Sequence, residues 1–169
     1  MLVRRRFMDM PFGQIHYREA GTSDFPPLML LHASPGSSKQ LEFLIKNLGK
    51  QFHVIAPDTM GNGDSTPPKQ EQPEISDYAN AMIAFSDQLG WKKMHLYGTH
   101  TGARIAVCMA LHEGGRIDRL ILDGFGLYTP KSLDQILKVY APSMEPDQQG
   151  LHVMQAWQLC RDQYIWFPW

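Results

Sequence analysis

The residues around His100 have a pattern that could support catalysis. His100 lies between Gly98 and Gly102, after a short apolar run and before a segment with helical spacing of apolar residues. Where a strand turns sharply into a helix, small residues are needed on both sides of the central one, whose side chain then stands above the sheet. The first amides of such a helix can stabilise a developing negative charge. Residues 98–102, hereafter the elbow, therefore predict a nucleophile elbow with His100 as its catalytic centre.

Two other loops follow predicted strands and are expected at the same edge of the sheet. Residues 32–38 form the first loop, and the backbone N–H of Ser34 is predicted to act as one oxyanion donor. The N–H of Thr101, directly after the elbow centre, is predicted to be the second donor. Residues 58–65 form another loop, which is rich in turn-forming residues.

The elements that would position these loops follow an alternating order. Short apolar runs are predicted to be strands at 28–31, 52–56, 94–97 and 120–122, and helical spacing covers 41–48 and 75–89. Gly49 and Gly90 mark the expected helix ends. Upstream, residues 3–8 and 14–18 predict a hairpin. The pattern indicates an α/β fold with a mostly parallel sheet, mixed at one edge and flanked by helices.

Together, the three loops resemble the α/β-hydrolase superfamily over about residues 3–126. Members carry a His-Gly-x-Pro loop, an Asp-x-x-Gly-x-Gly-x-Ser loop and a Gly-x-Ser-x-Gly elbow in this order. The resemblance implies an incomplete hydrolase core over 1–127, a helical cap starting near Tyr128 over 128–169, and a substrate pocket between them. In this sequence His100 replaces the family's Ser, Asp or Cys, and Ala33 replaces the loop glycine.

The substitution at the elbow centre leaves three interpretations of His100. Its imidazole could work as a nucleophile or, more readily, as a general base. The elbow could instead be retained only to bind a ligand, because histidine tolerates positive φ better than most residues. A substitution introduced to trap a complex is the third interpretation. The resemblance implies that the family's usual base and acid come from regions after those present here.

Several neighbouring polar residues have competing interpretations. Asp123 could be an acid that orients a histidine, or a turn residue at a strand end. The family counterpart of His32 holds its loop in shape by hydrogen bonds, which implies a structural role. We expect the Thr99 and Thr101 side chains to point away from the site, so neither is predicted to be a nucleophile. Asp58 is interpreted as a turn former.

Charge and motif content narrow the range of partners. The chain has 16 basic and 17 acidic residues and a formal net charge of −1, which predicts neither a nucleic-acid nor a membrane partner. No phosphate-cradling glycine motif is present, and the histidines have no ligand spacing. Cys108 and Cys160 form neither a disulfide framework nor a zinc motif. We therefore expect no cofactor, no metal and a cytoplasmic location.

Four aromatic residues fall within the last six positions of the chain, from Tyr164 to Trp169. An aromatic stretch of this kind is typical of the interior of a larger fold, whereas chain termini are usually solvated. We therefore expect the chain to be a fragment.

These observations predict hydrolysis of an ester, amide or similar bond in a small, mostly apolar substrate at a His100-centred elbow. The alternative function is non-catalytic binding of a ligand or partner by the same fold. Association into a homo-oligomer is compatible with both functions.

Overall fold

The computed structural model describes residues 1–129, 131–133 and 145–162. Contacts divide the chain into two compact units, Met1–Gly126 and Leu127–Trp169. The described part of the second unit includes helix α5 (Leu151–Asp162). Residues 164–169, which carry the terminal aromatic side chains, lie outside the described residues. That the second unit begins a helical cap stays a prediction.

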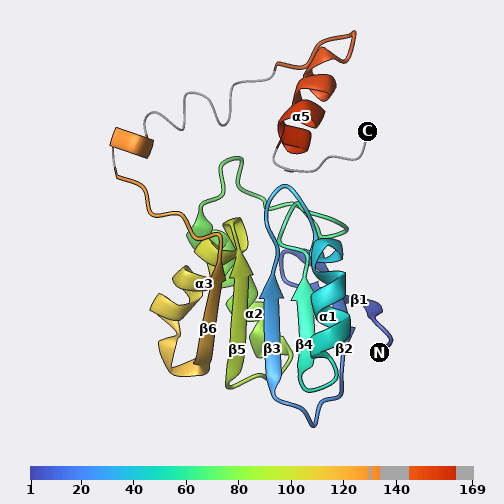
Figure 1. Ribbon diagram of the computed structural model, residues 1–169, viewed down its shortest axis with the longest axis vertical. Coiled ribbons are helices and arrows are strands. Elements are labelled where there is room, and N and C mark those ends of the chain that lie inside the picture. The colour runs from blue at the N-terminus through green and yellow to red at the C-terminus, as the bar shows by residue number, and fades with distance from the viewer. Residues whose placement is uncertain (130, 134–144, 163–169) are drawn as a thin grey trace. The chain divides into compact units, whose positions relative to one another are not determined.

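The first unit is built on a six-stranded sheet, ordered β1-β2-β4-β3-β5-β6 (Figure 1). The four strands β4, β3, β5 and β6 are parallel, and the β1–β2 hairpin joins β4 in antiparallel orientation. The predicted mixed sheet is therefore confirmed. The strands are β1 (Arg4–Met10), β2 (Gly13–Ala20), β3 (Pro27–Leu31), β4 (His53–Pro57), β5 (Met94–Thr99) and β6 (Ile117–Asp123).

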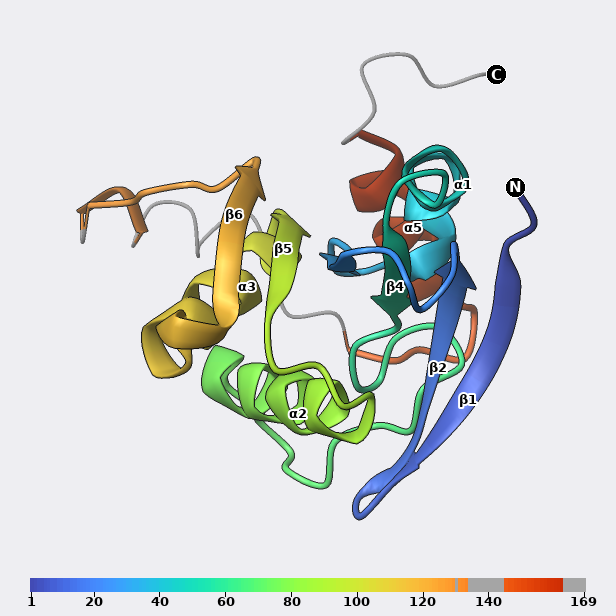
Figure 2. The same ribbon diagram turned by 90° about the horizontal axis from the view of Figure 1, so that it is seen from below.

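Helices cover both faces of this sheet (Figure 2). The short 3-10 turn η1 (Ser38–Leu41) leads into α1 (Glu42–Leu48) on one face. On the other face lie α2 (Ile75–Gln88) and α3 (Thr101–His112), and a second 3-10 turn, η2 (Gly114–Arg116), precedes β6. This three-layer order confirms the predicted α/β class.

Alternation along β3 shows how one strand supplies both cores. Leu28 and Leu30 pack with the α1 side, whereas Met29 and Leu31 pack with the α2 and α3 side, and all four are buried. Successive side chains of a strand point to opposite faces, so a continuous apolar run is needed where both faces are covered. This requirement explains why residues 28–31 contain no polar side chain.

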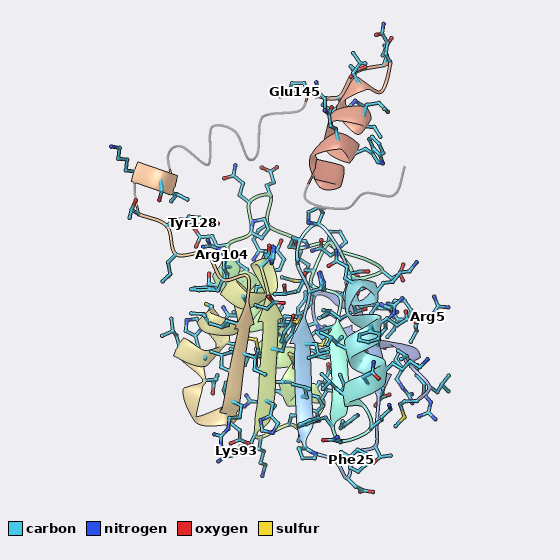
Figure 3. The ribbon with its side chains drawn as sticks, in the orientation of Figure 1. Arg5, Phe25, Lys93, Arg104, Tyr128 and Glu145 are labelled. Atoms are coloured by element: carbon cyan, nitrogen blue, oxygen red, sulfur yellow. The ribbon has the colours of Figure 1, made fainter. Side chains whose placement is uncertain are left out.

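The parallel strands end at one edge of the sheet, and this edge carries the predicted functional loops. In Figure 3 the label of Arg104, near the start of α3, lies toward this edge, whereas Lys93 and Phe25 lie at the opposite edge, before β5 and β3. None of the helices in the described ranges has the length and apolar character that crossing a bilayer requires.

Candidate active site

The chain turns from β5 into α3 within a single residue. Thr99 ends the strand, Thr101 begins the helix, and His100 between them has φ 51° and ψ −110°. Among the described residues other than glycine, His100 alone has a positive φ. Such a backbone conformation is sterically costly for a side chain larger than hydrogen, and strain of this kind clusters at functional sites.

The two elbow glycines allow three backbones to meet at this turn. A Cβ on Gly98 would collide with the backbone of Gly102 and Ala103, and a Cβ on Gly102 would collide with the carbonyls of Leu31 and His32. The first turn of α3 thus lies directly against both β5 and the end of β3. Side chains at either glycine would force these elements apart.

The imidazole of His100 is exposed and has specific neighbours. Its Nδ1 lies 3.3 Å from the Oγ1 of Thr99, and its backbone N–H donates to the carbonyl of Asp123 at 2.8 Å. A Cβ on Gly124 would collide with the ring at Nδ1 and Cε1. The expectation that Thr99 points away from the site is therefore wrong, because the tight turn brings its hydroxyl back to the neighbouring ring.

The carboxylate of Asp123 is held by a tyrosine from the adjacent strand. The phenol O–H of Tyr97 donates to Asp123 Oδ2 at 2.7 Å. Partial burial and the adjacent carboxylate raise the pKa of Tyr97 to about 12, although a hydrogen bond with the Thr99 side chain acts in the opposite direction. Tyr97 therefore stays protonated at neutral pH. The sequence pattern did not single out Tyr97, because its contact with Asp123 depends on strand register.

The two predicted oxyanion donors lie on neighbouring segments. Thr101 is the first residue of α3, and the first helical hydrogen bonds run from the N–H groups of Ala103 and Arg104 to the His100 carbonyl. The Thr101 amide therefore precedes the hydrogen bonds within the helix. Ser34 is exposed in the loop after β3, and its hydroxyl lies 3.5 Å from Asn62 Oδ1. Their role as oxyanion donors stays a prediction.

His32 links the first two functional loops from a buried position. Its Nε2 accepts a hydrogen bond from the N–H of Thr59 at 3.0 Å, so its Nδ1 carries the proton donated to the Ala33 carbonyl at 2.8 Å. Burial is the largest influence and lowers the pKa of His32. These bonds agree with the structural role implied by the family resemblance.

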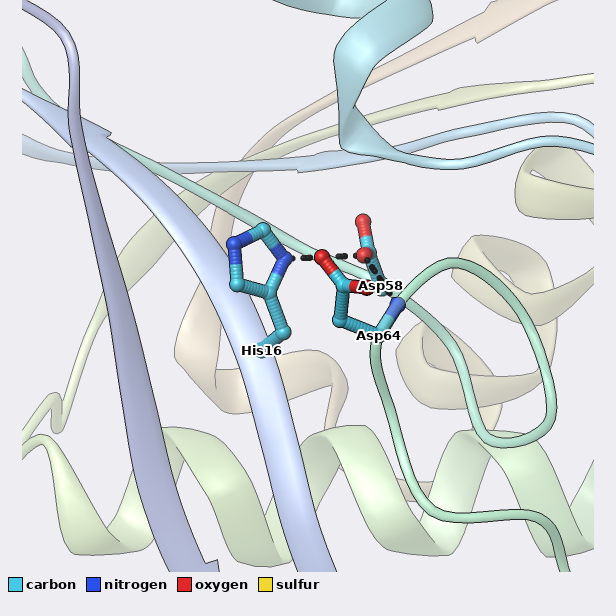
Figure 4. A group of neighbouring side chains, drawn as sticks. All are labelled: His16, Asp58 and Asp64. Atoms are coloured by element: carbon cyan, nitrogen blue, oxygen red, sulfur yellow. Dashed lines mark hydrogen bonds and ion pairs between the residues drawn. The ribbon is translucent and has the colours of Figure 1, made fainter.

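A second buried histidine, His16 on β2, pairs with Asp58 at the end of β4 (Figure 4). His16 Nδ1 lies 2.8 Å from Asp58 Oδ2, and both side chains are only 1% exposed. Burial raises the pKa of Asp58, but hydrogen bonds from Ser38, Asp64 and His16 outweigh it and hold this pKa below its usual range. Asp58 thus does more than form a turn, because its carboxylate joins three separate segments.

His16, Asp58 and Asp64 bring ligand-type atoms within 4.8 Å of one another. No local sequence pattern indicated this group, because His16 and Asp58 lie 42 positions apart. The Asp58 oxygens already accept hydrogen bonds from the amides of Ser38 and Asp64 as well as from the His16 ring. Hydrogen bonds within the protein therefore already satisfy the Asp58 carboxylate.

Comparison with known proteins identifies the family. The protein-family model that describes the alpha/beta hydrolase fold matches residues 26–151. The chain belongs to this family. Curated relatives of this α/β hydrolase include an uncharacterized hydrolase of Saccharomyces cerevisiae, 30% identical over 137 residues, or 79% of this chain and 47% of the relative. Haloalkane dehalogenase 2 of Mycobacterium tuberculosis is 31% identical over 69% of this chain and 40% of its own length.

Solved structures support the same fold. The epoxide hydrolase VrEH1 of Vigna radiata matches with a TM-score of 0.79 at 18% identity, covering 95% of this chain and 56% of that one. A putative hydrolase of Bacillus subtilis matches with a TM-score of 0.65 at 28% identity, over 70% of this chain and 42% of that one. This α/β hydrolase chain thus spans about half the length or less of the two curated relatives named above.

Proposed function

We propose that this α/β hydrolase belongs to an enzyme that cleaves an ester, amide or similar bond in a small, mostly apolar substrate by activating water at His100. The observation that carries the proposal is the position of His100 at a strained strand-to-helix turn, with a positive φ and an exposed imidazole. Strained backbone persists where the surrounding structure holds it, and it is concentrated at active sites.

In this mechanism His100 acts as a general base. The Thr99 hydroxyl lies beside Nδ1, so Nε2 is the nitrogen that takes a proton from water as the water oxygen attacks the substrate carbonyl carbon. The N–H groups of Ser34 and Thr101 would bind the resulting oxyanion. The imidazolium then returns its proton to the leaving group, which completes the hydrolysis with atoms and charge in balance.

Related proteins support a small-molecule substrate. The names of those with significant similarity include haloalkane dehalogenase, carboxylesterase and epoxide hydrolase, each an enzyme of small organic molecules. For this protein, the bond type, the cap formed by residues 128–169 and the cytoplasmic location are part of the proposal.

The test is hydrolysis of short p-nitrophenyl esters by the full protein, compared with His100→Ala and His100→Ser from about pH 5 to 9. We expect turnover that His100→Ala abolishes and a rate that increases with pH, as general-base catalysis requires. Turnover that persists in His100→Ala would contradict the proposal.

The alternative function, ligand or partner binding without turnover, is favoured by the absence of a hydroxyl nucleophile at position 100. It predicts that the unaltered protein is silent and that His100→Ser alone gains activity. That outcome would identify the elbow as a retained scaffold.

A further inference from the structure

Four polar side chains near the ends of β5 and β6 form a series, and the proposed mechanism uses only two of them, His100 and Thr99. Asp123 Oδ2 lies 2.7 Å from the Tyr97 phenol oxygen, and Thr99 Oγ1 lies 3.3 Å from His100 Nδ1. Tyr97 and Thr99 project from the same face of β5, and the Thr99 side chain lowers the pKa of Tyr97 as a hydrogen-bonding group would. We refer to Asp123, Tyr97, Thr99 and His100 as the elbow hydrogen-bond chain.

Strand register brings these groups together. In the parallel pairing of β5 with β6, Thr99 is opposite Asp123 and Tyr97 is opposite Ile121. Because side chains alternate along a strand, Tyr97, Thr99 and Asp123 all project from one face of the sheet. The elbow hydrogen-bond chain therefore runs along one face of the sheet, from the Asp123 carboxylate to His100.

Donors and acceptors in the chain have one consistent direction. A carboxylate only accepts, so Tyr97 must donate to Asp123. The Tyr97 oxygen can then accept the Thr99 hydroxyl proton, and the Thr99 oxygen can accept the proton on His100 Nδ1. In this arrangement Nε2 has no proton and is ready to accept one.

We propose that Tyr97 and Thr99 are positioning residues that connect His100 to the Asp123 carboxylate and hold the imidazole as its Nδ1–H tautomer. This inference rests on the proposed function, since it assigns a supporting structure to the same base. Asp123 then has the orienting role of an acid, although its carboxylate does not bond the imidazole directly. Its negative charge also compensates the positive charge that His100 gains during the reaction.

The backbone of Gly124 limits how far the His100 ring can move when the Thr99 hydroxyl is removed. A Cβ at this position would overlap the Nδ1 and Cε1 edge of the ring, so the backbone of Gly124 lies directly against that edge. Loss of the Thr99 hydroxyl should therefore leave the ring in place and change mainly which nitrogen carries the proton.

The direct test is ¹⁵N NMR of the imidazole nitrogens in histidine-labelled full protein, with His100→Ala used to assign the resonances. We expect His100 to be in the Nδ1–H form above its ionisation, and Thr99→Val and Tyr97→Phe to convert it to a mixture of tautomers. In ester hydrolysis both variants should lower kcat about tenfold with KM unchanged, because a base in the wrong tautomer cannot accept the proton. Asp123→Asn keeps an acceptor for Tyr97 but removes the charge, so it should lower kcat while retaining the Nδ1–H form.

Matched controls remove the same chemical groups elsewhere. Tyr78→Phe deletes a phenol hydroxyl on α2, and Asp118→Asn neutralises a carboxylate at the other end of β6. Both controls should leave the His100 spectrum and kcat unchanged. Circular dichroism and thermal melting confirm that each variant is folded.

The outcomes separate this inference from the proposed function. If hydrolysis needs His100 but Thr99→Val leaves both the tautomer and kcat unchanged, the elbow hydrogen-bond chain is refuted and the proposed hydrolase function stands. If the protein hydrolyses no ester but Thr99→Val loses the Nδ1–H form, the elbow hydrogen-bond chain is supported and the proposed hydrolase function is refuted.

Discussion

His32 and His16 are both buried near the carboxyl edge of the sheet, but their partners differ in charge. His32 lies between two backbone groups, accepting from the Thr59 N–H and donating to the Ala33 carbonyl. His16 instead lies beside the carboxylate of Asp58. Protonation of His32 would therefore bury a positive charge with no carboxylate bonded to the ring, which is unfavourable.

The first prediction concerns the pH dependence of stability. Because burial holds the pKa of His32 below its ordinary value of 6.5, the unfolded chain takes up a proton first as the pH falls. The contribution of His32 to the free energy of unfolding is thus complete above this value and decreases below it. We expect His32→Gln, whose amide oxygen can accept from Thr59, to lose less stability than the unaltered protein between about pH 7.5 and 5.5. Urea denaturation at both pH values measures this, and parallel profiles would contradict it.

The second prediction concerns the Asp58 carboxylate. Asp58→Asn should lower the free energy of unfolding by about 3 kcal/mol, because it replaces a buried carboxylate that accepts hydrogen bonds from His16, Ser38 and Asp64. Asp64→Asn is the matched control, since the side chain of Asp64 is exposed, and it should change stability by less than about 0.5 kcal/mol. Equal effects of the two substitutions in urea denaturation would refute the buried pair.

The sequence predicted the site at the level of loops rather than side-chain partners. The position of His100 at a sharp turn follows from two nearby glycines and a local steric rule. The contacts from Tyr97 to Asp123 and from His16 to Asp58 join positions 26 and 42 residues apart. Those contacts depend on strand order and register, which no local pattern specifies.

Among the elements, the junction of β3, β5 and α3 depends on close backbone approach. Gly102→Ala should destabilise the fold by more than about 2 kcal/mol, because the added Cβ would collide with the carbonyls of Leu31 and His32. Gly115→Ala is the control, since a Cβ there meets nothing within 4 Å. A thermal melt that places both variants at the same temperature would contradict this account.

Element boundaries were predicted best where both faces of a strand are covered. The run 28–31 corresponds to β3 (Pro27–Leu31), since burial on both faces demands a continuous apolar segment. The run 120–122 captured only part of β6, which begins at Ile117. Asp118 and Arg119 interrupt the apolar pattern because β6 lies at the edge of the sheet and is exposed there.

Across the whole sheet, the face that carries α1 is less covered than the opposite face. A groove of about 370 Å³ separates α1 from β6 and has almost entirely apolar walls, including Leu30, Leu44 and Ile121. Along β6, Leu120, Ile121 and Leu122 are each more than a third exposed. An exposed apolar edge strand favours pairing with another chain.

We therefore expect residues 1–169, expressed alone, to self-associate. Ile121→Lys should shift the population toward monomer, because a charge on an edge strand opposes pairing. Phe43→Lys is the matched control, since Phe43 is an exposed apolar residue on α1, and it should have no such effect. Size-exclusion chromatography with light scattering measures the mass, and a sharp monomer peak with cooperative melting of the unaltered chain would refute the prediction.

The two borders of the sheet differ in chemistry, and this difference limits how large an assembly can become. The β1 border carries the exposed arginines Arg4 and Arg5, whose like charges repel the same border of another copy. Two copies joined through β6 would place both β1 borders on the outside. Such a pair would have two-fold symmetry and would leave only the arginine-bearing β1 borders for a third copy. Association through β6 therefore ends in a closed pair, whereas pairing through both borders would build an open-ended fibre.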